Sequence, residues 1–125
     1  MWMKTNPNPK GKLVPDCVIR AVSIALGQDW YTIYDSLCAV GREDCNMPSA
    51  DDVWGHFLYC CGFEPFLLPQ ACPECVTIDA FCHMYPVGTY IIGTGSHAVA
   101  IIDGNYYDSW DSGYEIPSFF WRIAN

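Results

Sequence analysis

The first two thirds of the chain carry apolar residues at helical spacing. Residues 17–26 are apolar on nearly every side of a helix, with Asp16 before them as a good N-cap and Gly27 after them as a stop. This pattern predicts a buried central helix. Three further helices are expected at residues 28–40, 49–61 and 77–85, where apolar positions recur between capping and stopping residues.

The pattern changes to the two-residue alternation of β-strands after Gly88. Asp103 and Gly104 separate two runs rich in β-branched and aromatic residues, and Asp-Gly between such runs predicts a tight β-hairpin. Strands are expected at residues 63–68, 89–94, 98–103, 105–108 and 116–123. Helices followed by an antiparallel sheet predict the α+β class.

Proline and glycine shape the beginning of the chain. Three prolines and Gly11 between residues 5 and 15 exclude a helix there, so we expect an extended arm. With 125 residues, 51% of them hydrophobic, the chain fits a single domain with a substantial core. That domain would consist of the arm at residues 1–15, a mainly helical half at 16–85 and an antiparallel β half at 86–125.

Charge is distributed unevenly along the chain. The formal net charge is −8, and beyond residue 20 thirteen acidic residues face only Arg42 and Arg122. This acidic body argues against nucleic-acid and anionic-membrane partners, and we expect the basic arm to be a solvated terminus. Without a signal-peptide pattern or a membrane-spanning apolar run, the expected location is the cytoplasm, where the eight cysteines would stay mostly reduced.

Three residues form a candidate catalytic set. Cys17 lies in the first turn of a predicted helix, where the partial positive charge of the helix end favours the thiolate. The unpaired backbone N–H groups of that turn, including that of Cys17, could stabilise an oxyanion. His97 begins a predicted core strand and Asp108 lies across the hairpin from it. Nucleophile, base and orienting carboxylate would then be Cys17, His97 and Asp108.

These residues resemble the papain-like cysteine peptidases. Residues 97–100 (His-Ala-Val-Ala) and 108–110 (Asp-Ser-Trp) look like that family's histidine strand and Asn-Ser-Trp segment, and Asp16-Cys17 looks like the start of its nucleophile helix. The Asp in third place is closer to the bacterial peptidases that trim double-glycine leader peptides. The chain is also similar to short proteins encoded by bacteria and their phages. The resemblance implies the papain-like cysteine proteinase fold, with Cys17 facing His97 across a cleft between a helical and a β half.

The chain departs from the family pattern near the nucleophile. The family has a glutamine about six residues before its cysteine, which completes the oxyanion hole, and here that place falls on Gly11. We expect Asn8 or Asn6 to supply the second oxyanion donor instead. Asp16 would raise the pKa of the neighbouring thiol unless its carboxylate is turned to cap the helix.

Aromatic residues gather near the end of the chain. Trp110 could form a wall of a substrate groove, and Asp111 could give that groove an acidic edge suited to a basic or neutral peptide.

Cysteines gather in a second region. Cys72 and Cys75 have the spacing of a zinc knuckle, and Cys60 or Cys82 could supply further ligands. A second pair of that kind is absent from the sequence. We therefore favour a tight turn with buried thiols and expect no metal.

The sequence favours a cysteine hydrolase that cleaves a peptide or isopeptide amide through a Cys-His-Asp triad and a thioester, acting on a peptide or protein substrate without a cofactor. Two alternatives stay open. A deamidase, transglutaminase or other acyltransferase could use the same residues on the same fold. A catalytically inactive papain-like binding protein of phage or bacterial origin would agree with Asp16 and Gly11 at the positions described above.

Overall fold

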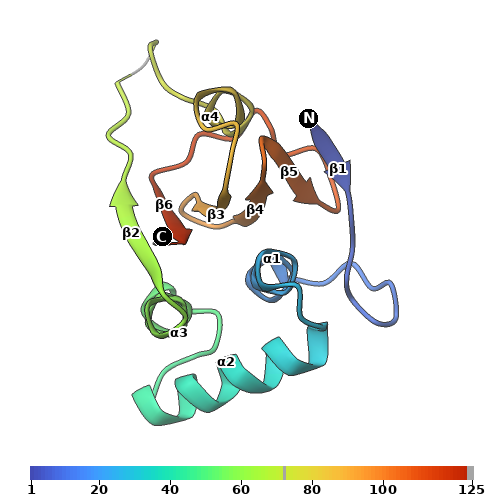
Figure 1. Cartoon of the computed structure of the whole chain (residues 1–125). Helices are drawn as coiled ribbons and strands as arrows, with labels where there is room; N and C mark the ends of the chain where they lie inside the picture. The colour runs from blue at the N-terminus through green and yellow to red at the C-terminus, as the bar shows by residue number, and fades with distance from the viewer. Residues whose placement is uncertain (72, 124–125) are drawn as a thin grey trace.

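A six-stranded sheet runs through the protein and carries helices on both faces (Figure 1). The computed structural model describes residues 1–71 and 73–123. The helices are α1 (Cys17–Leu26), α2 (Trp30–Asp44), α3 (Asp51–Cys60) and α4 (Ile78–Met84). The strands are β1 (Trp2–Lys4), β2 (Phe63–Leu67), β3 (Thr89–Gly93), β4 (Ala98–Ile102), β5 (Asn105–Asp108) and β6 (Phe119–Ile123). The α+β class predicted from the sequence is confirmed.

The strands lie in the order β1-β5-β4-β3-β6-β2. All neighbours are antiparallel except β1 and β5, so the sheet is mixed and the expectation of a purely antiparallel sheet was wrong. The N-terminal arm is accordingly not a solvated terminus, because Trp2 pairs with Tyr106 and Lys4 with Asp108 at one edge of the sheet. The opposite edge is β2, which comes from the helical half and pairs with β6.

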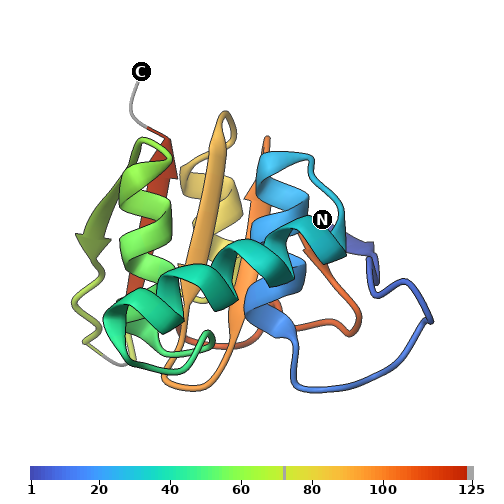
Figure 2. The ribbon, with the colours of Figure 1, turned by 90° about the horizontal axis from the view of Figure 1, so that it is seen from below.

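The helices form layers on the two faces of the sheet. In Figure 1, α4 lies above the sheet and α1 and α3 lie below it. Figure 2, seen from below, shows α2 crossing α1 and α3 on the outside, and both of these helices contact α2. None of the helices in the described parts of the chain is long and apolar enough to cross a bilayer.

The alternation along β4 explains how α1 comes close to the sheet. Ala98 and Ala100 belong to the core shared with α1, whereas Val99 and Ile101 belong to the core shared with α4. Successive side chains of a strand point to opposite faces, so the small alanines both face α1. Short side chains allow a close approach, which brings the first turn of α1 to the beginning of β4.

The predicted hairpin is confirmed, and its turn has two residues. Asp103 and Gly104 have φ values of 49° and 79°, and they join Ile102 and Asn105, which are paired across the strands. Positive φ at both central positions is the type I′ turn that suits the twist of a hairpin. This turn sets the pairing of β4 with β5, so that the end of β5 lies beside the beginning of β4.

Two helix ends differ from the sequence prediction. The second helix does not stop at Gly41 but continues to Asp44, and Cys45 ends it with φ 54°. A Cβ at Gly41 would lie 2.7 Å from the Asn46 carbonyl oxygen, so this glycine permits a close approach of the following loop. The third helix is capped at Ala50 rather than at Ser49.

Candidate active site

Cys17 is the first residue of α1 and lies next to His97. Burial raises the pKa of the Cys17 thiol, but hydrogen bonds with the His97 side chain and the Ala98 backbone N–H outweigh burial. The charges of His97 and Arg20 add to them, so the pKa of this thiol lies below its ordinary value of 9.0. These contacts all favour the thiolate, the form of cysteine that reacts as a nucleophile.

His97 lies directly before β4 and is held on two sides. Its Nε2 lies 2.5 Å from Oδ2 of Asp108, which leaves Nδ1 as the nitrogen available to the Cys17 thiol. The Trp110 ring stacks on the imidazole, with 4.9 Å between ring centroids and 29° between planes. Burial lowers the pKa of His97, but its hydrogen bonds with Asp108 and Cys17 outweigh burial and raise that pKa from 6.5 to about 9. The opposite shifts of Cys17 and His97 favour a thiolate–imidazolium pair.

Asp108 ends β5, and its carboxylate is almost fully enclosed, with 2% of the side chain exposed. Oδ2 accepts from Ser112 Oγ at 2.7 Å as well as contacting His97. Oδ1 accepts from the Ser109 backbone N–H at 2.8 Å and from Arg20 at 3.3 Å. Burial raises the pKa of this carboxyl, but the bonds from His97 and Ser112 outweigh burial and lower it. The residue therefore stays ionised and orients the imidazole.

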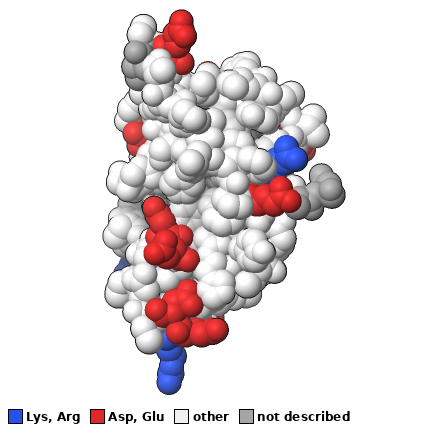
Figure 3. Space-filling view, turned by 90° about the vertical axis from the view of Figure 1, so that its left-hand side faces the viewer, with Lys and Arg blue, Asp and Glu red and all other residues white. Residues whose placement is uncertain are grey.

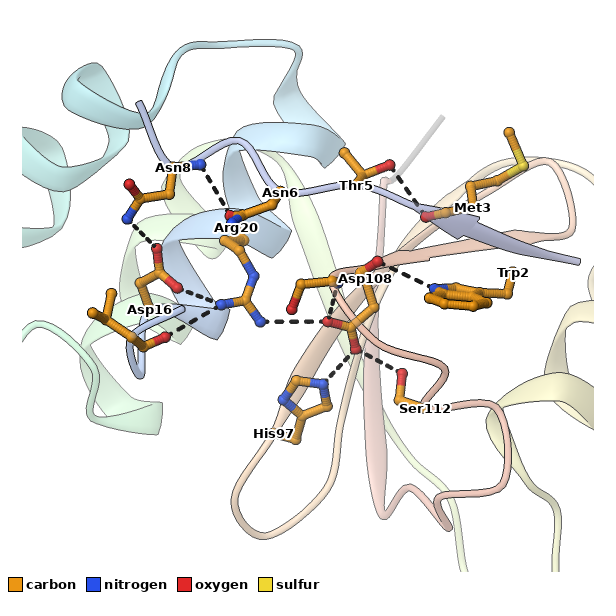
Figure 4. A network of polar contacts seen from close by, with 12 residues as sticks. Trp2, Met3, Thr5, Asn6, Asn8, Asp16, Arg20, His97, Asp108 and Ser112 are labelled. Carbon is orange, nitrogen blue, oxygen red and sulfur yellow. Dashed lines mark hydrogen bonds and ion pairs between the residues drawn. The ribbon is translucent and has the colours of Figure 1, made fainter. Parts of the chain in front are cut away.

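Asp16 does not act as the expected side-chain cap of α1. Its carboxylate is buried, forms an ion pair with Arg20 and accepts from Asn8 Nδ2 at 3.2 Å (Figure 4). It also accepts from Trp30 Nε1 at 2.9 Å. A guanidinium and an indole N–H compete for this carboxylate with the backbone N–H groups of the first helical turn. The charge beside the nucleophile is thus compensated by Arg20.

Asn6 and Asn8 are not placed as the expected oxyanion donors. The Asn8 amide donates to Asp16, and its Oδ1 accepts from the backbone N–H groups of Lys10 and Lys12. The Asn6 amide donates to the Lys12 carbonyl oxygen. Neither asparagine lines the cavities beside Cys17, so both order the N-terminal arm instead. Cys17 is the first residue of α1, where a backbone N–H has no partner within the helix, so its role as an oxyanion donor stays a prediction.

Two cavities open on either side of the Cys17–His97 pair. One has a volume of about 350 Å³, and its lining residues are Leu13, Val14, Pro15, Cys17, Arg20, Ser96, His97, Ser109 and Trp110. The other, of about 250 Å³, is lined by Pro15, Cys17, Val18, Ser49, Asp51, Trp54, Thr94, Gly95, Ser96, His97 and Ala98. Trp110 therefore forms a groove wall as expected. Asp111 does not, since its carboxylate accepts from Tyr106 and lines a separate cavity.

A third, apolar cavity shares one lining residue with the second of these. It has a volume of about 420 Å³ and lies at the edge of the sheet formed by β2 and β6. Its lining residues are Asp51, Pro65, Phe66, Leu67, Phe119 and Trp121. Asp51 lines both cavities, so the two are neighbours on the surface.

The structure does not assemble the possible zinc site. Cys75 is disulfide-bonded, which removes it as a ligand and contradicts the expectation of a reduced thiol there. Cys72 lies outside the described residues. Cys60 is exposed at the end of α3, and Cys82 is buried in α4. Within residues 1–71 and 73–123, no group of three His, Cys, Asp or Glu side chains could hold a metal ion.

Arg20 and Ser112 are site residues that sequence reasoning did not identify. Arg20 is the only charged residue of α1 and follows Cys17 by three positions, and that isolated charge on an apolar helix was the available signal. Ser112 gave none, because it lies in an irregular segment after β5. Comparisons of this chain with protein-family models, curated proteins and solved structures found no match.

Proposed function

We propose that the protein is a cysteine hydrolase of papain-like design that cleaves amide bonds in polypeptides. The observation that carries this proposal is the contact chain from Cys17 through His97 to Asp108, set at the junction of two cavities. The nucleophile begins a helix, and base and acid come from neighbouring antiparallel strands in the order Cys, His, Asp. That arrangement resembles the papain-like cysteine peptidases, and the fold that we propose is therefore the papain-like one.

The first half of the reaction forms a thioester. The Cys17 thiolate attacks the carbonyl carbon of the substrate amide, and the carbonyl π electrons move to the oxygen. The resulting oxyanion accepts a hydrogen bond from the Cys17 backbone N–H. Collapse of this intermediate breaks the C–N bond, and the departing nitrogen takes the proton from His97 Nδ1, which releases an amine.

The second half consumes one water molecule. Neutral His97 removes a proton from the water as its oxygen attacks the thioester carbon. The tetrahedral intermediate then expels the Cys17 thiolate and leaves a carboxylic acid. Asp108 stays ionised throughout and stabilises the imidazolium that exists before the first step and after the last.

The cavities favour a polypeptide over a small amide. Cys17 lines two cavities, and the apolar cavity beside β2 shares Asp51 with one of them. Leu67 is 83% exposed there and Phe66 37%. Figure 3, which views the side of the molecule on which β2 lies, shows scattered acidic groups and few basic ones on a largely uncharged surface. An extended peptide with a large apolar side chain near the scissile amide suits this surface.

A peptide library prepared by digesting a bacterial proteome tests the proposal. We expect new peptide termini after incubation with the protein, with a large apolar residue enriched at one fixed distance from the cleaved bond. Cys17→Ala should give none, whereas Cys38→Ala should cleave like the unmodified protein. Side-chain deamidation or peptide joining without cleavage would instead indicate one of the acyl-transfer activities. Cleavage that persists in Cys17→Ala would overturn the assignment.

Alkylation distinguishes an active site from an inactive one without any substrate. With limiting iodoacetamide at mildly acidic pH, we expect selective labelling of Cys17 that His97→Ala abolishes. Uniform, slow labelling of all accessible cysteines would contradict a catalytic pair and favour a binding protein.

A further inference from the structure

Arg20 connects the nucleophile helix to the catalytic acid. Its guanidinium forms ion pairs with Asp16 and with Asp108, which is 88 residues away in the chain. All three side chains are at most 8% exposed. Figure 4 shows the guanidinium between the two carboxylates, with His97 and Ser112 both below the Asp108 carboxylate. A buried arginine with two buried acidic partners is costly to desolvate, so its position requires an explanation.

The contacts of Asp108 indicate what Arg20 does. One carboxylate oxygen receives Arg20 and the Ser109 backbone N–H, and the other faces His97 and Ser112. Rotation of the carboxylate would break contacts on both oxygens at once. Of its side-chain donors, only Arg20 comes from α1, the helix that begins with Cys17. Arg20 thus links the position of the acid directly to the helix that carries the nucleophile.

We propose that Arg20 is the positioning residue of this site, because by bridging Asp16 and Asp108 it fixes the carboxylate so that Oδ2 faces His97. This role rests on the proposed function, since it concerns the same triad. Asp16 has a matching part in the arrangement. Trp30 and Asn8 hold the Asp16 carboxylate, which in turn holds the side of the Arg20 guanidinium that faces away from Asp108.

The charged groups around the triad determine the sign of the expected effect. They come from every element that meets there and are Lys4 on β1, Asp16 and Arg20 at α1, Asp51 on α3, His97 before β4 and Asp108 on β5. Arg20 is the buried cation of this set besides His97, and Lys4 and Asp51 are exposed. Removal of the guanidinium together with the Asp16 carboxylate leaves the net charge unchanged but takes the Arg20 contact from Oδ1 of Asp108. The imidazolium of His97 is then held less firmly beside Cys17, which disfavours the thiolate.

The decisive experiment measures the rate of Cys17 alkylation by iodoacetamide against pH. The test variant is Asp16→Asn/Arg20→Met, which removes the Arg20 guanidinium together with the Asp16 carboxylate so that no unpaired charge is left at residue 16. We expect its thermal midpoint to stay near that of the unmodified protein. The alkylation profile should move to higher pH, with a rate at pH 6 roughly tenfold lower. Arg42→Met, the same substitution at an exposed arginine, is the matched control and should change neither.

Two results separate this proposal from the proposed function. If His97→Ala shifts the alkylation profile but Asp16→Asn/Arg20→Met leaves it unchanged, Arg20 serves only to compensate Asp16 and the positioning role is wrong. If His97→Ala has no effect on the alkylation profile, Cys17 and His97 are not a catalytic pair and the proposed function is wrong. Arg20→Lys sharpens the first result. Lysine keeps the charge but loses the planar two-partner geometry, so we expect a profile between those of the unmodified protein and the double variant.

Discussion

Helices α1 and α4 pack on opposite faces of the same sheet, and each carries a cysteine close to it. Burial is the largest influence on both thiols and raises the pKa of each. In Cys17 the contacts with His97 and Ala98 reverse that effect, and the pKa falls below 9.0. Cys82 has no such partners among the described residues, and its pKa rises to about 11.

The difference lies in the place each thiol has along its helix. Cys17 is the first residue of α1, where unpaired N–H groups and the partial positive charge of the helix end are available. Cys82 lies in the body of α4, where the backbone N–H groups are used within the helix and the neighbours are apolar or aromatic. Packing against a core therefore raises the pKa of a thiol and makes the thiol unreactive, unless a cation and hydrogen-bond donors lie beside it.

The largest difference between the two regions is expected when each of the two thiols is removed in turn. Cys17→Ala should lower peptide hydrolysis by roughly 10⁴-fold or more, because no other group can form the thioester. Cys82→Ala should leave the rate within about twofold of the unmodified protein, measured by mass spectrometry of cleaved peptides. Equal losses in both variants would mean that the assay reports folding rather than chemistry.

A smaller effect is expected from neutralising the acid. Asp108→Asn keeps the shape of the side chain but removes the charge that stabilises the imidazolium, so kcat should fall roughly 10²-fold. Asp111→Asn is the control, since that carboxylate lies outside the grooves beside Cys17. Steady-state kinetics on one cleaved peptide would measure both, and an unchanged kcat in Asp108→Asn would remove Asp108 from the mechanism.

The pH dependence should differ between the two thiols in a defined direction. Because the pKa of Cys17 is lowered, its alkylation should reach half of the maximal rate below pH 9.0, whereas Cys82 should require a pH near 11. Hydrolysis should decline as the pH rises through about 9, where His97 loses the proton that the leaving amine needs. Alkylation followed cysteine by cysteine with peptide mapping would measure this, and identical profiles would contradict the comparison.

The smallest effect is expected from the aromatic wall. Trp110→Ala removes the ring stacked on His97, which loosens the imidazole without altering its hydrogen bond to Asp108. We expect hydrolysis to fall about threefold to tenfold, in line with an aromatic contact of about 1 kcal/mol. Tyr59→Ala, at a residue that is 70% exposed, is the control. A loss as large as that of Asp108→Asn would show that Trp110 does more than pack.

Local signals predicted the parts of the site that are close in sequence. Asp103-Gly104 set the hairpin, and with it the proximity of His97 and Asp108. The helix predicted at residues 77–85 begins with Thr77, a residue type that caps helices, and its hydroxyl accepts from the Ala80 backbone N–H at 3.1 Å. Such features depend on a few neighbouring residues, so the sequence states them directly.

Features made by distant residues could not be predicted in this way. The strand β1 has only three residues and no alternation that marks it, and its pairing with β5 depends on the rest of the sheet being in place. The partners of the Asp16 carboxylate are equally distant, because Trp30 and Asn8 reach it from other segments. A capping residue is predicted from its own helical turn alone. Here a buried arginine and an indole N–H bind the Asp16 carboxylate in place of the backbone N–H groups of that turn.

The contact between Arg20 and Asp108 also has a consequence for the stage of synthesis at which the proposed site is assembled. Cys17 and its helix are synthesised early, but Asp108 follows Arg20 by 88 residues and is absent until the chain is nearly complete. The strand that bears Asp108 pairs locally with β4, but its pairing with β1 and the contact of Asp108 with Arg20 are long-range, and such contacts form late in folding. The growing chain therefore carries an ordinary thiol, and the proposed peptidase acquires its reactivity only when the sheet is nearly complete.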